Sequence, residues 1–406
     1  MKLLHVINSM DPITGGPSQG IRNLDNSMKQ QGVHVEVVCL DDPSSDYLGK
    51  DKFKIHALGK GLGPWSYNVD LSQWLRLHLP RFDIVVINGL WLYCSYATWR
   101  AVKFMKAHQD SANTPPKIFV MPHGMLDPYF QEAKSRRFKS VRNWIYWKLI
   151  EHRVVKGADA MLFTCQTELQ LAETTFQPYQ PQAVYNAGYG IEEPPEFTSA
   201  MSAAFYTLCP DIKRQPYLVF LSRIHPKKGT DLLISTYIGL HEKARTSNKV
   251  IPQLVIAGPG IDSAFGKQLI ALLRKHPEVE KDVFFPGMLA GDAKWGCFYN
   301  CEAFILPSHQ ENFGIVVAEA LACSKAVLIS NQVNIWQEIE KNQGGIIADD
   351  TLQGTEFLLT QWFQMSEQEK VLMCSKARLT FTNNFLIATA AKKYVEIFKS
   401  KLQNNT

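Results

Sequence analysis

Short apolar runs alternate with longer segments of helical periodicity in the first half of the chain. The runs are rich in valine, isoleucine and leucine, which is typical of strands buried on both faces of a parallel sheet. The pattern predicts strands over residues 3–7, 33–39, 83–88, 118–121, 160–164 and 183–185, and helices over residues 19–31, 93–108 and 138–156. This alternation indicates a doubly wound α/β domain.

The alternation starts again after residues 191–202, where prolines, acids and small polar residues interrupt it as a linker would. It predicts strands over residues 217–222, 254–257, 283–285, 303–306 and 326–330, and helices over residues 231–241, 265–275, 292–299 and 315–322. We therefore expect two Rossmann-like domains in tandem, residues 1–190 and 191–384, with a final helix at about 385–406 packing back onto the first. Ligands bind at the carboxyl ends of such strands, so we expect a cleft between the domains.

The composition is that of a globular protein and excludes several classes. Hydrophobic residues make up 46% of the chain and charged residues 20%, and the net charge of +5 is spread over both halves. Extensive disorder and a nucleic-acid partner are therefore not expected, because nucleic-acid binders concentrate cations on one face or tail. No signal peptide and no apolar stretch of the ~20 residues that a spanning helix needs is evident, so we expect a cytoplasmic protein.

The eight cysteines are scattered and form no Cys-x-x-Cys pair. We interpret them as reduced thiols. Cys297 and Cys301 could share a helix face as metal ligands, but we favour packing, because free cysteine behaves as a small apolar residue. The sequence therefore predicts neither a bound metal nor a cofactor.

Basic residues gather where one predicted strand meets a helix. Residues 221–231 read LSRIHPKKGTD, which places Arg223, Lys227, Lys228 and Gly229 at the strand end. Arginine offers a planar fork to phosphate oxygens and lysine a point charge, so together they could neutralise a diphosphate without a metal. Taken alone, the segment could equally be a solvated basic turn.

Two glutamates, Glu311 and Glu319, bracket the start of the helix predicted over residues 315–322. One carboxylate could bind hydroxyls near the helix start, while the other could accept from a ribose diol. The backbone amides between them suit a phosphate, because they lie at the positive end of a helix; they belong to Asn312, Phe313, Gly314, Ile315 and Val316. Glu319 lies within an apolar stretch and therefore needs a partner.

An early glycine-rich loop follows the first predicted strand. Gly15 and Gly16 could let the backbone approach an anion at a helix amino terminus. The spacing of Gly15, Gly16 and Gly20 does not fit the G-x-G-x-x-G fingerprint, so NAD is not expected. An ordinary tight turn is the alternative interpretation.

Four segments, in this order, resemble the retaining GT-B glycosyltransferases of family 4 (group 1), particularly members that build exopolysaccharide. They are Gly15-Gly16-Pro17, the turn from Arg223 to Gly229, residues 283–287, and Glu311-x7-Glu319. The run at 122–126, Pro-His-Gly-Met-Leu, is also similar to that family's N-terminal domain. The resemblance spans nearly the whole chain and implies the GT-B fold, two tandem Rossmann-like domains with a cleft between them.

The resemblance also implies roles for residues of the second domain. Arg223 and Lys228 would hold the donor diphosphate, and Glu319 would bind the ribose hydroxyls. Glu311, with the amides of residues 312–314, would hold the 3- and 4-hydroxyls of the donor sugar.

Further roles follow from the same resemblance. Gly287 and Met288 would flank the nucleotide base, and Gly15 and Gly16 would approach the phosphate or sugar. His123 would sit beside the donor sugar near its 6-hydroxyl. Judged from the sequence alone, a single histidine after a strand more often has a structural role, with its hydrogen bonds satisfied inside the fold.

The activity so implied is the transfer of a hexose, with retention, from a nucleotide-diphosphate donor to a glycan or lipid-linked glycan in polysaccharide biosynthesis. UDP-glucose or a related UDP-hexose is the favoured donor. No Asp-x-Asp occurs, so we expect fixed charge and helix dipole to replace a divalent ion. A sugar-nucleotide epimerase and a non-catalytic nucleotide or glycan binder are the alternatives.

A basic and aromatic segment covers residues 131–156. Lysines and arginines at 134, 136, 137, 139, 142, 148, 153 and 156 outnumber the acids at 132 and 151. This composition can lie on an anionic membrane surface. We favour the alternative in which Trp144 and Trp147 pack inward, and keep peripheral membrane contact open.

Overall fold

The computed structural model describes residues 1–108, 114–132, 137–212, 215–247 and 251–403. The chain divides into two compact units. The N-terminal domain comprises residues 1–190 and the helix α17 (Ile387–Gln403), and the C-terminal domain comprises residues 191–386. Each is a Rossmann-like α/β domain built on a parallel sheet.

The N-terminal domain has a seven-stranded sheet in the order β3-β2-β1-β4-β5-β6-β7. The strands are β1 (Lys2–Ile7), β2 (His34–Cys39), β3 (Lys54–Ala57), β4 (Ile84–Asn88), β5 (Lys117–Met121), β6 (Ala160–Phe163) and β7 (Val184–Asn186). The helices are α1 (Gly16–Gln30), α2 (Val69–His78), α3 (Tyr93–Ala107), α4 (Tyr129–Glu132), α5 (Arg137–Tyr146), α6 (His152–Gly157) and α7 (Gln166–Thr175), besides α17.

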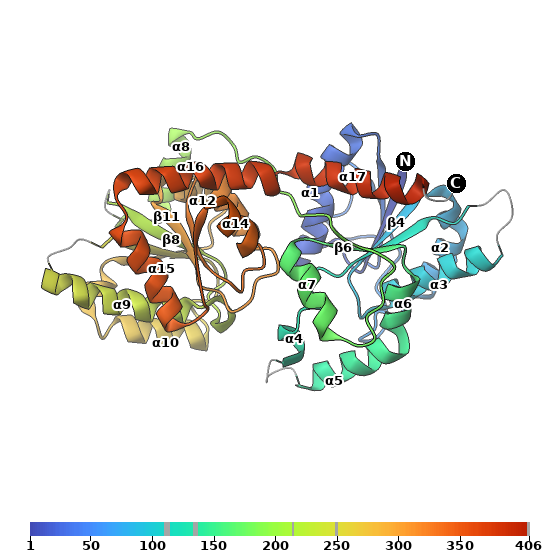
Figure 1. Ribbon diagram of the computed structural model, residues 1–406, viewed down its shortest axis with the longest axis horizontal. Helices are drawn as coiled ribbons and strands as arrows, with labels where there is room; N and C mark the ends of the chain where they lie inside the picture. Colours follow the sequence, from blue (N-terminus) through green and yellow to red (C-terminus); the bar gives the residue numbers. More distant parts are fainter. Residues whose placement is uncertain (109–113, 133–136, 213–214, 248–250, 404–406) are drawn as a thin grey trace. The chain divides into compact units, whose positions relative to one another are not determined.

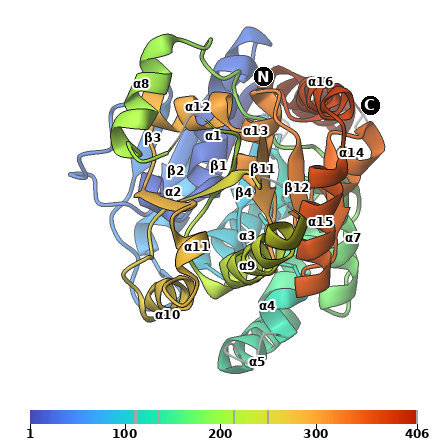
Figure 2. The same cartoon turned by 90° about the vertical axis from the view of Figure 1, so that its left-hand side faces the viewer.

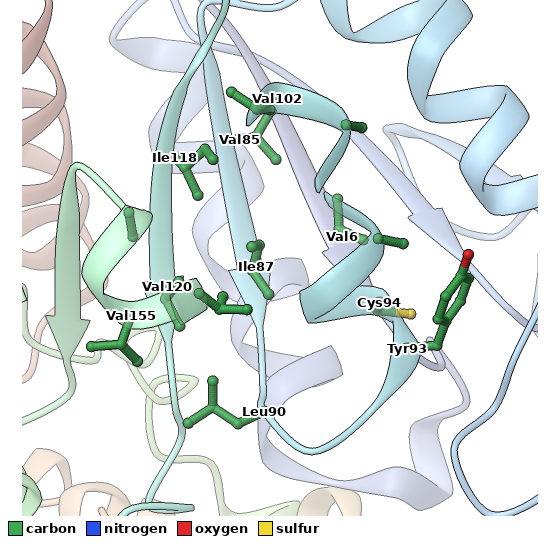
Figure 3. Packing of buried hydrophobic residues seen from close by; sticks show 14 of the residues in the cluster. Val6, Val85, Ile87, Leu90, Tyr93, Cys94, Val102, Ile118, Val120 and Val155 are labelled. Atoms are coloured by element: carbon green, nitrogen blue, oxygen red, sulfur yellow. The ribbon is translucent and has the colours of Figure 1, made fainter. Parts of the chain in front are cut away.

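Two apolar cores cover the two faces of this sheet, because alternate strand residues point to opposite sides. On one face Val85, Ile87 and Ile118 pack with Val155 of α6, as Figure 3 shows. On the other face Ile84 and Val86 share a cluster with residues of α17. The helix α17 lies along α1 (Figure 1), so the end of the chain completes the N-terminal domain.

The C-terminal domain has a six-stranded sheet in the order β10-β9-β8-β11-β12-β13. The strands are β8 (Tyr217–Leu221), β9 (Gln253–Ala257), β10 (Val283–Gly287), β11 (Ala303–Leu306), β12 (Val327–Ser330) and β13 (Gly345–Ala348). The helices are α8 (Ser199–Leu208), α9 (Thr230–Ser247), α10 (Ala264–Leu273), α11 (Pro277–Glu280), α12 (Gly291–Asn300), α13 (Ile315–Ala322), α14 (Trp336–Asn342), α15 (Leu352–Gln364) and α16 (Glu367–Asn384).

The helices α8 and α12 pack closely in the C-terminal domain, as Figure 2 shows. A Cβ added to Gly296 of α12 would lie 2.0 Å from the carbonyl oxygen of Met201 in α8. Glycine is therefore required at this crossing, because any side chain would push the helices apart.

The predicted strands are all present, with ends that differ by one or two residues, and the sequence pattern missed two others. These are β3 and β13, which lie at the edges of the two sheets and are only partly buried. An edge strand needs no continuous apolar run, so periodicity gives it little signal. The expected linker at 191–202 is also partly wrong, because α8 begins at Ser199.

The helix expected over 138–156 is interrupted. A π-helical turn, Trp147–Glu151, separates α5 from α6. Trp147 is buried as expected, whereas Trp144 is 56% exposed and does not pack inward. The basic positions 134 and 136 of this segment lie outside the described residues.

Candidate functional site

Two loops meet at the carboxyl ends of the adjacent strands β8 and β11. The first is the basic turn, in which a short 3-10 helix, Pro226–Lys228, leads to Gly229 in the left-handed region. The second loop follows Pro307, whose carbonyl oxygen would lie 1.9 Å from a Cβ on Gly229. The amide of His309 also donates to the Lys227 carbonyl at 2.8 Å. Glycine is thus needed where the two loops cross.

Lys228 and Glu311 form an ion pair between these loops. The Lys228 side chain is only 9% exposed and the Glu311 side chain 24%. Burial, with a further contribution from Lys227 and Arg223, lowers the pKa of Lys228 to about 7. The adjoining Glu311 carboxylate opposes that shift. Arg223 is exposed at the same turn, so three cations gather at one strand end.

The helix α13 begins directly after this ion pair. Gly314 caps it in the left-handed region, with φ 76°. The backbone of Glu311 is fixed, because its amide donates to Gln332 at 2.9 Å and its carbonyl accepts from Asn334 at 3.0 Å. Ile315 and Val316 are the first two helical residues, so their amides have no carbonyl partner within the helix. A phosphate would fit such a helix start.

Glu319 has the partner that its apolar surroundings require. Lys294 of α12 places Nζ 2.8 Å from Oε1 of Glu319, and the two side chains are 21% and 14% exposed. The Lys294 ammonium also lies 4.2 Å from the ring centroid of Trp295. Sequence reasoning predicted a partner but missed Lys294, because nothing in the local spacing connects residues in two different helices.

Gly287 and Met288 lie at the end of β10, on the same sheet edge but two strands away from β8. Gly287 has a positive φ of 76°, and the Met288 side chain is 75% exposed. Phe313 instead turns inward and packs edge-on against Phe385, with ring centroids 5.5 Å apart.

In the N-terminal domain, His123 and the early glycines also follow the carboxyl ends of strands. Gly15 has φ 91° and caps α1, which begins at Gly16, three residues earlier than predicted. His123 follows β5 and places Nε2 3.1 Å from Oδ1 of Asn88, the last residue of β4. Burial lowers the pKa of His123 to about 4, so the imidazole is neutral at pH 7.

The family follows from comparisons with known proteins. A model described as glycosyl transferases group 1 matches residues 210–370, and one described as glycosyl transferase 4-like domain matches residues 15–187. The chain belongs to the glycosyltransferases. The two matches fall on the two domains and include the basic turn, both glutamates and His123.

Curated relatives of this glycosyltransferase match over part of their length. A D-inositol 3-phosphate glycosyltransferase of Gordonia bronchialis is 28% identical over 139 residues, which are 33% of this chain and 30% of that protein. One from Kribbella flavida is 28% identical over 182 residues, 44% of this chain and 42% of that protein. The chain thus spans less than half the length of each.

Solved structures are similar over nearly the whole chain. A glycosyltransferase from Rickettsia africae has a TM-score of 0.75 at 16% identity, covering 99% of both chains. Anabaena HepE in complex with UDP has a TM-score of 0.73 at 14% identity, covering 98% of this chain and 100% of that one. At such identities the likeness shows the fold, which is that of the GT-B glycosyltransferases.

Other expected features of this glycosyltransferase can be located. All eight cysteines are free thiols, and Cys297 and Cys301 are both buried in the apolar core. In the ranges that the structure describes, no three histidine, cysteine, aspartate or glutamate side chains are grouped to hold a metal ion. None of the helices in those ranges combines the length and apolarity of a membrane span.

Proposed function

We propose that the protein is a retaining, metal-independent hexosyltransferase that uses a UDP-linked hexose, with UDP-glucose favoured. The observation that carries this is the pairing of both motif glutamates with lysines at one sheet edge, Lys228 with Glu311 and Lys294 with Glu319. The comparison adds support, because Anabaena HepE has been crystallised with UDP-glucose.

The donor diphosphate would meet Arg223, Lys228 and the start of α13. Fixed cations and helix amides stabilise charge that develops on a leaving diphosphate, and they need no rearrangement during the reaction. Lys228 would shift its ammonium from Glu311 toward the phosphate, which frees the Glu311 carboxylate to accept from sugar hydroxyls. Glu319, held by Lys294, would accept from the ribose diol.

The transfer step exchanges one bond for another at the anomeric carbon. The bond from this carbon to the β-phosphate oxygen breaks, and the acceptor oxygen bonds to the carbon on the same face. The departing phosphate oxygen takes the acceptor proton. His123 is neutral at neutral pH and would position the sugar.

A panel of UDP-, GDP- and ADP-sugars tests this function without an acceptor. Thermal shift and slow donor hydrolysis are measured for wild type, Arg223→Ala and Glu311→Ala, with and without chelator. We expect one donor to stabilise and be hydrolysed by wild type alone, equally well in chelator. If the variants respond like wild type, or if wild type binds none of the donors, the proposed site is refuted.

The same reactions separate the alternatives. An epimerase converts the donor to an isomeric nucleotide sugar without an acceptor, whereas a transferase releases UDP and free hexose. A binding module gives a thermal shift and neither product. For the transferase, glycan or lipid-linked glycan acceptors of polysaccharide biosynthesis are then added to the active donor.

Our proposal includes peripheral contact with an anionic membrane through the surface of α5 and the following turn. Val141, Trp144, Ile145 and Leu149 are 59%, 56%, 47% and 60% exposed. Their spacing places them on one helical face, and exposed cations such as Lys148 lie beside them. This combination is typical of interfacial helices.

Sedimentation with lipid vesicles tests the contact. Wild type should bind vesicles that contain phosphatidylglycerol better than neutral ones, and a Trp144→Ser/Leu149→Ser variant should lose that binding. Leu379→Ser is the control, because Leu379 is 58% exposed on α16. Equal binding by all three proteins would remove membrane contact from the proposal.

A further inference from the structure

Three polar side chains form a row across adjacent strands of the N-terminal sheet. His5 of β1, Asn88 at the end of β4 and His123 just after β5 lie side by side, because β4 is paired with β1 and β5. Nδ2 of Asn88 is 3.1 Å from Nδ1 of His5, and Oδ1 of Asn88 is 3.1 Å from Nε2 of His123. His5 and Asn88 are buried, and His123 is half-buried.

A backbone carbonyl decides which way the Asn88 amide points. The atom that contacts His5 also lies 3.2 Å from the carbonyl oxygen of Val86. A carbonyl only accepts hydrogen bonds, so this atom must be the amide nitrogen. The flipped amide would place two oxygens against each other in a buried site. The other amide atom, which faces His123, is therefore the oxygen.

The orientation of Asn88 in turn decides where the His123 proton lies. An oxygen that only accepts requires a donor, so Nε2 of His123 carries the hydrogen. The imidazole is neutral, because burial lowers the pKa of His123 to about 4. Its second nitrogen, Nδ1, is then unprotonated and can only accept a hydrogen bond.

The backbone at His123 is held in place against its own preference. His123 has φ 51°, in the left-handed region that side chains other than glycine rarely adopt. The following amide, of Gly124, donates to Glu168 at 2.5 Å, and Glu168 also accepts from Thr164 at 2.7 Å. A strained residue that its surroundings hold this firmly is typical of a functional position.

We propose that Asn88 is a positioning residue that fixes His123 as its Nε2–H tautomer, so that Nδ1 accepts a hydrogen bond from a hydroxyl of the sugar substrate. The inference rests on the proposed function for the identity of the ligand. The tautomer itself requires no ligand. His5, which accepts from Asn88, supports the amide from the buried side.

Nuclear magnetic resonance of protein labelled with ¹⁵N-histidine tests the tautomer directly. In wild type at pH 7 we expect a proton bonded to Nε2 of His123 and none on Nδ1. Asn88→Asp keeps the acceptor but adds a charge, so the half-protonation pH of His123 should rise by about one to three units. Asn88→Val removes the acceptor, so the Nε2 proton should exchange with water at least tenfold faster.

The control is Asn186→Val, at the end of β7 in the same sheet, where Oδ1 accepts from the Gly188 amide at 3.1 Å. It should leave the His123 signals unchanged. A proton on Nδ1 in wild type, or an unchanged His123 in both Asn88 variants, would overturn the inference. His123→Gln assigns the signals.

A binding measurement connects the tautomer to the substrate. Asn88→Val removes the acceptor that fixes the tautomer, so it should weaken binding of the UDP-hexose by roughly 2- to 10-fold, about one hydrogen bond. Binding of UDP, which lacks the hexose and its hydroxyls, should stay within about twofold of wild type. Equal weakening for both ligands would assign Asn88 a purely structural role. If wild type binds no nucleotide sugar, the proposed function fails while the resonance test of the tautomer still stands.

Discussion

Substitution of Lys228 tests whether a residue that binds the donor also lowers the stability of the fold. The substitution Lys228→Met keeps the volume and the apolar stem of the side chain but removes the ammonium. The side chain is 9% exposed and pairs with Glu311, so the charge is largely taken out of water. We predict that the variant binds the donor more weakly and yet folds more stably.

The magnitude follows from the pKa of Lys228. Burial, with Lys227 and Arg223, lowers it from 10.5 to about 7, which corresponds to about 5 kcal/mol at about 1.4 kcal/mol per pKa unit. The variant also loses the ion pair with the part-exposed Glu311, which reduces this gain in stability by about 1 kcal/mol. Allowing for relaxation around a buried charge, Lys228→Met should raise the free energy of unfolding at pH 6 by on the order of 3 kcal/mol.

The pH dependence gives a second signature with a definite sign. Between about pH 7 and pH 10.5 the folded protein has lost the Lys228 proton, whereas the unfolded chain still holds it. Wild-type stability therefore gains a contribution as pH rises through this window. The variant lacks this contribution. The amount by which its free energy of unfolding exceeds that of wild type should therefore be largest below pH 7 and vanish near pH 10.5.

Calorimetric unfolding of both proteins from pH 6 to pH 10 measures this difference. Lys281→Met is the matched control, because Lys281 is 61% exposed and its ion pair is with the nearby surface residue Glu278. It should change stability by less than about 0.5 kcal/mol. In parallel, Lys228→Met should weaken UDP-hexose binding roughly 10- to 150-fold, the value of a charged hydrogen bond to phosphate. A destabilised variant, or an advantage that grows with pH, would refute the reasoning.

Three further outcomes are expected. Gly229→Ala should lower the free energy of unfolding by about 2 kcal/mol or more in urea titrations, because its Cβ would lie 1.9 Å from a carbonyl oxygen. Gly239→Ala is the control and should not show this loss, because a Cβ on Gly239 would have no atom within 4 Å. Lys294→Met and Glu319→Gln should each weaken UDP binding. Titration calorimetry of the single and double variants should show that their effects on the binding free energy differ from additivity by about 0.5–3 kcal/mol. Burial raises the pKa of Glu151 from 4.5 to about 7, so the free energy of unfolding of wild type falls as pH rises through that window. Glu151→Gln should therefore unfold at a higher temperature than wild type at pH 8, but not at pH 4.

The parts of the site that lie close together in sequence could be predicted. Glu311 and Glu319 flank a helix start, so their spacing alone places one carboxylate in the loop and the other on the helix. The basic turn follows a strand with a clear apolar run. Because β8 and β11 are adjacent in the sheet, the structure joins both segments through Lys228 and Glu311.

The parts that depend on packing between distant segments could not be predicted. Lys294 reaches Glu319 from another helix, and Asn88 reaches His123 from a neighbouring strand. Each is an ordinary polar residue in its own segment, and only the order of strands and the packing of helices reveal its partner. The prediction that Trp144 packs inward is wrong for a related reason, since composition does not tell which helical face turns inward.

Two predicted site residues are held in states that oppose folding. Lys228 is a buried cation, and His123 occupies a left-handed backbone conformation at φ 51°. Folding alone favours a neutral residue at the first position and a relaxed backbone at the second. Each of these states instead presents a charge or a lone pair at the carboxyl edge of a sheet. Variants that relieve them should therefore be as stable as wild type or more so, and should bind the donor less well.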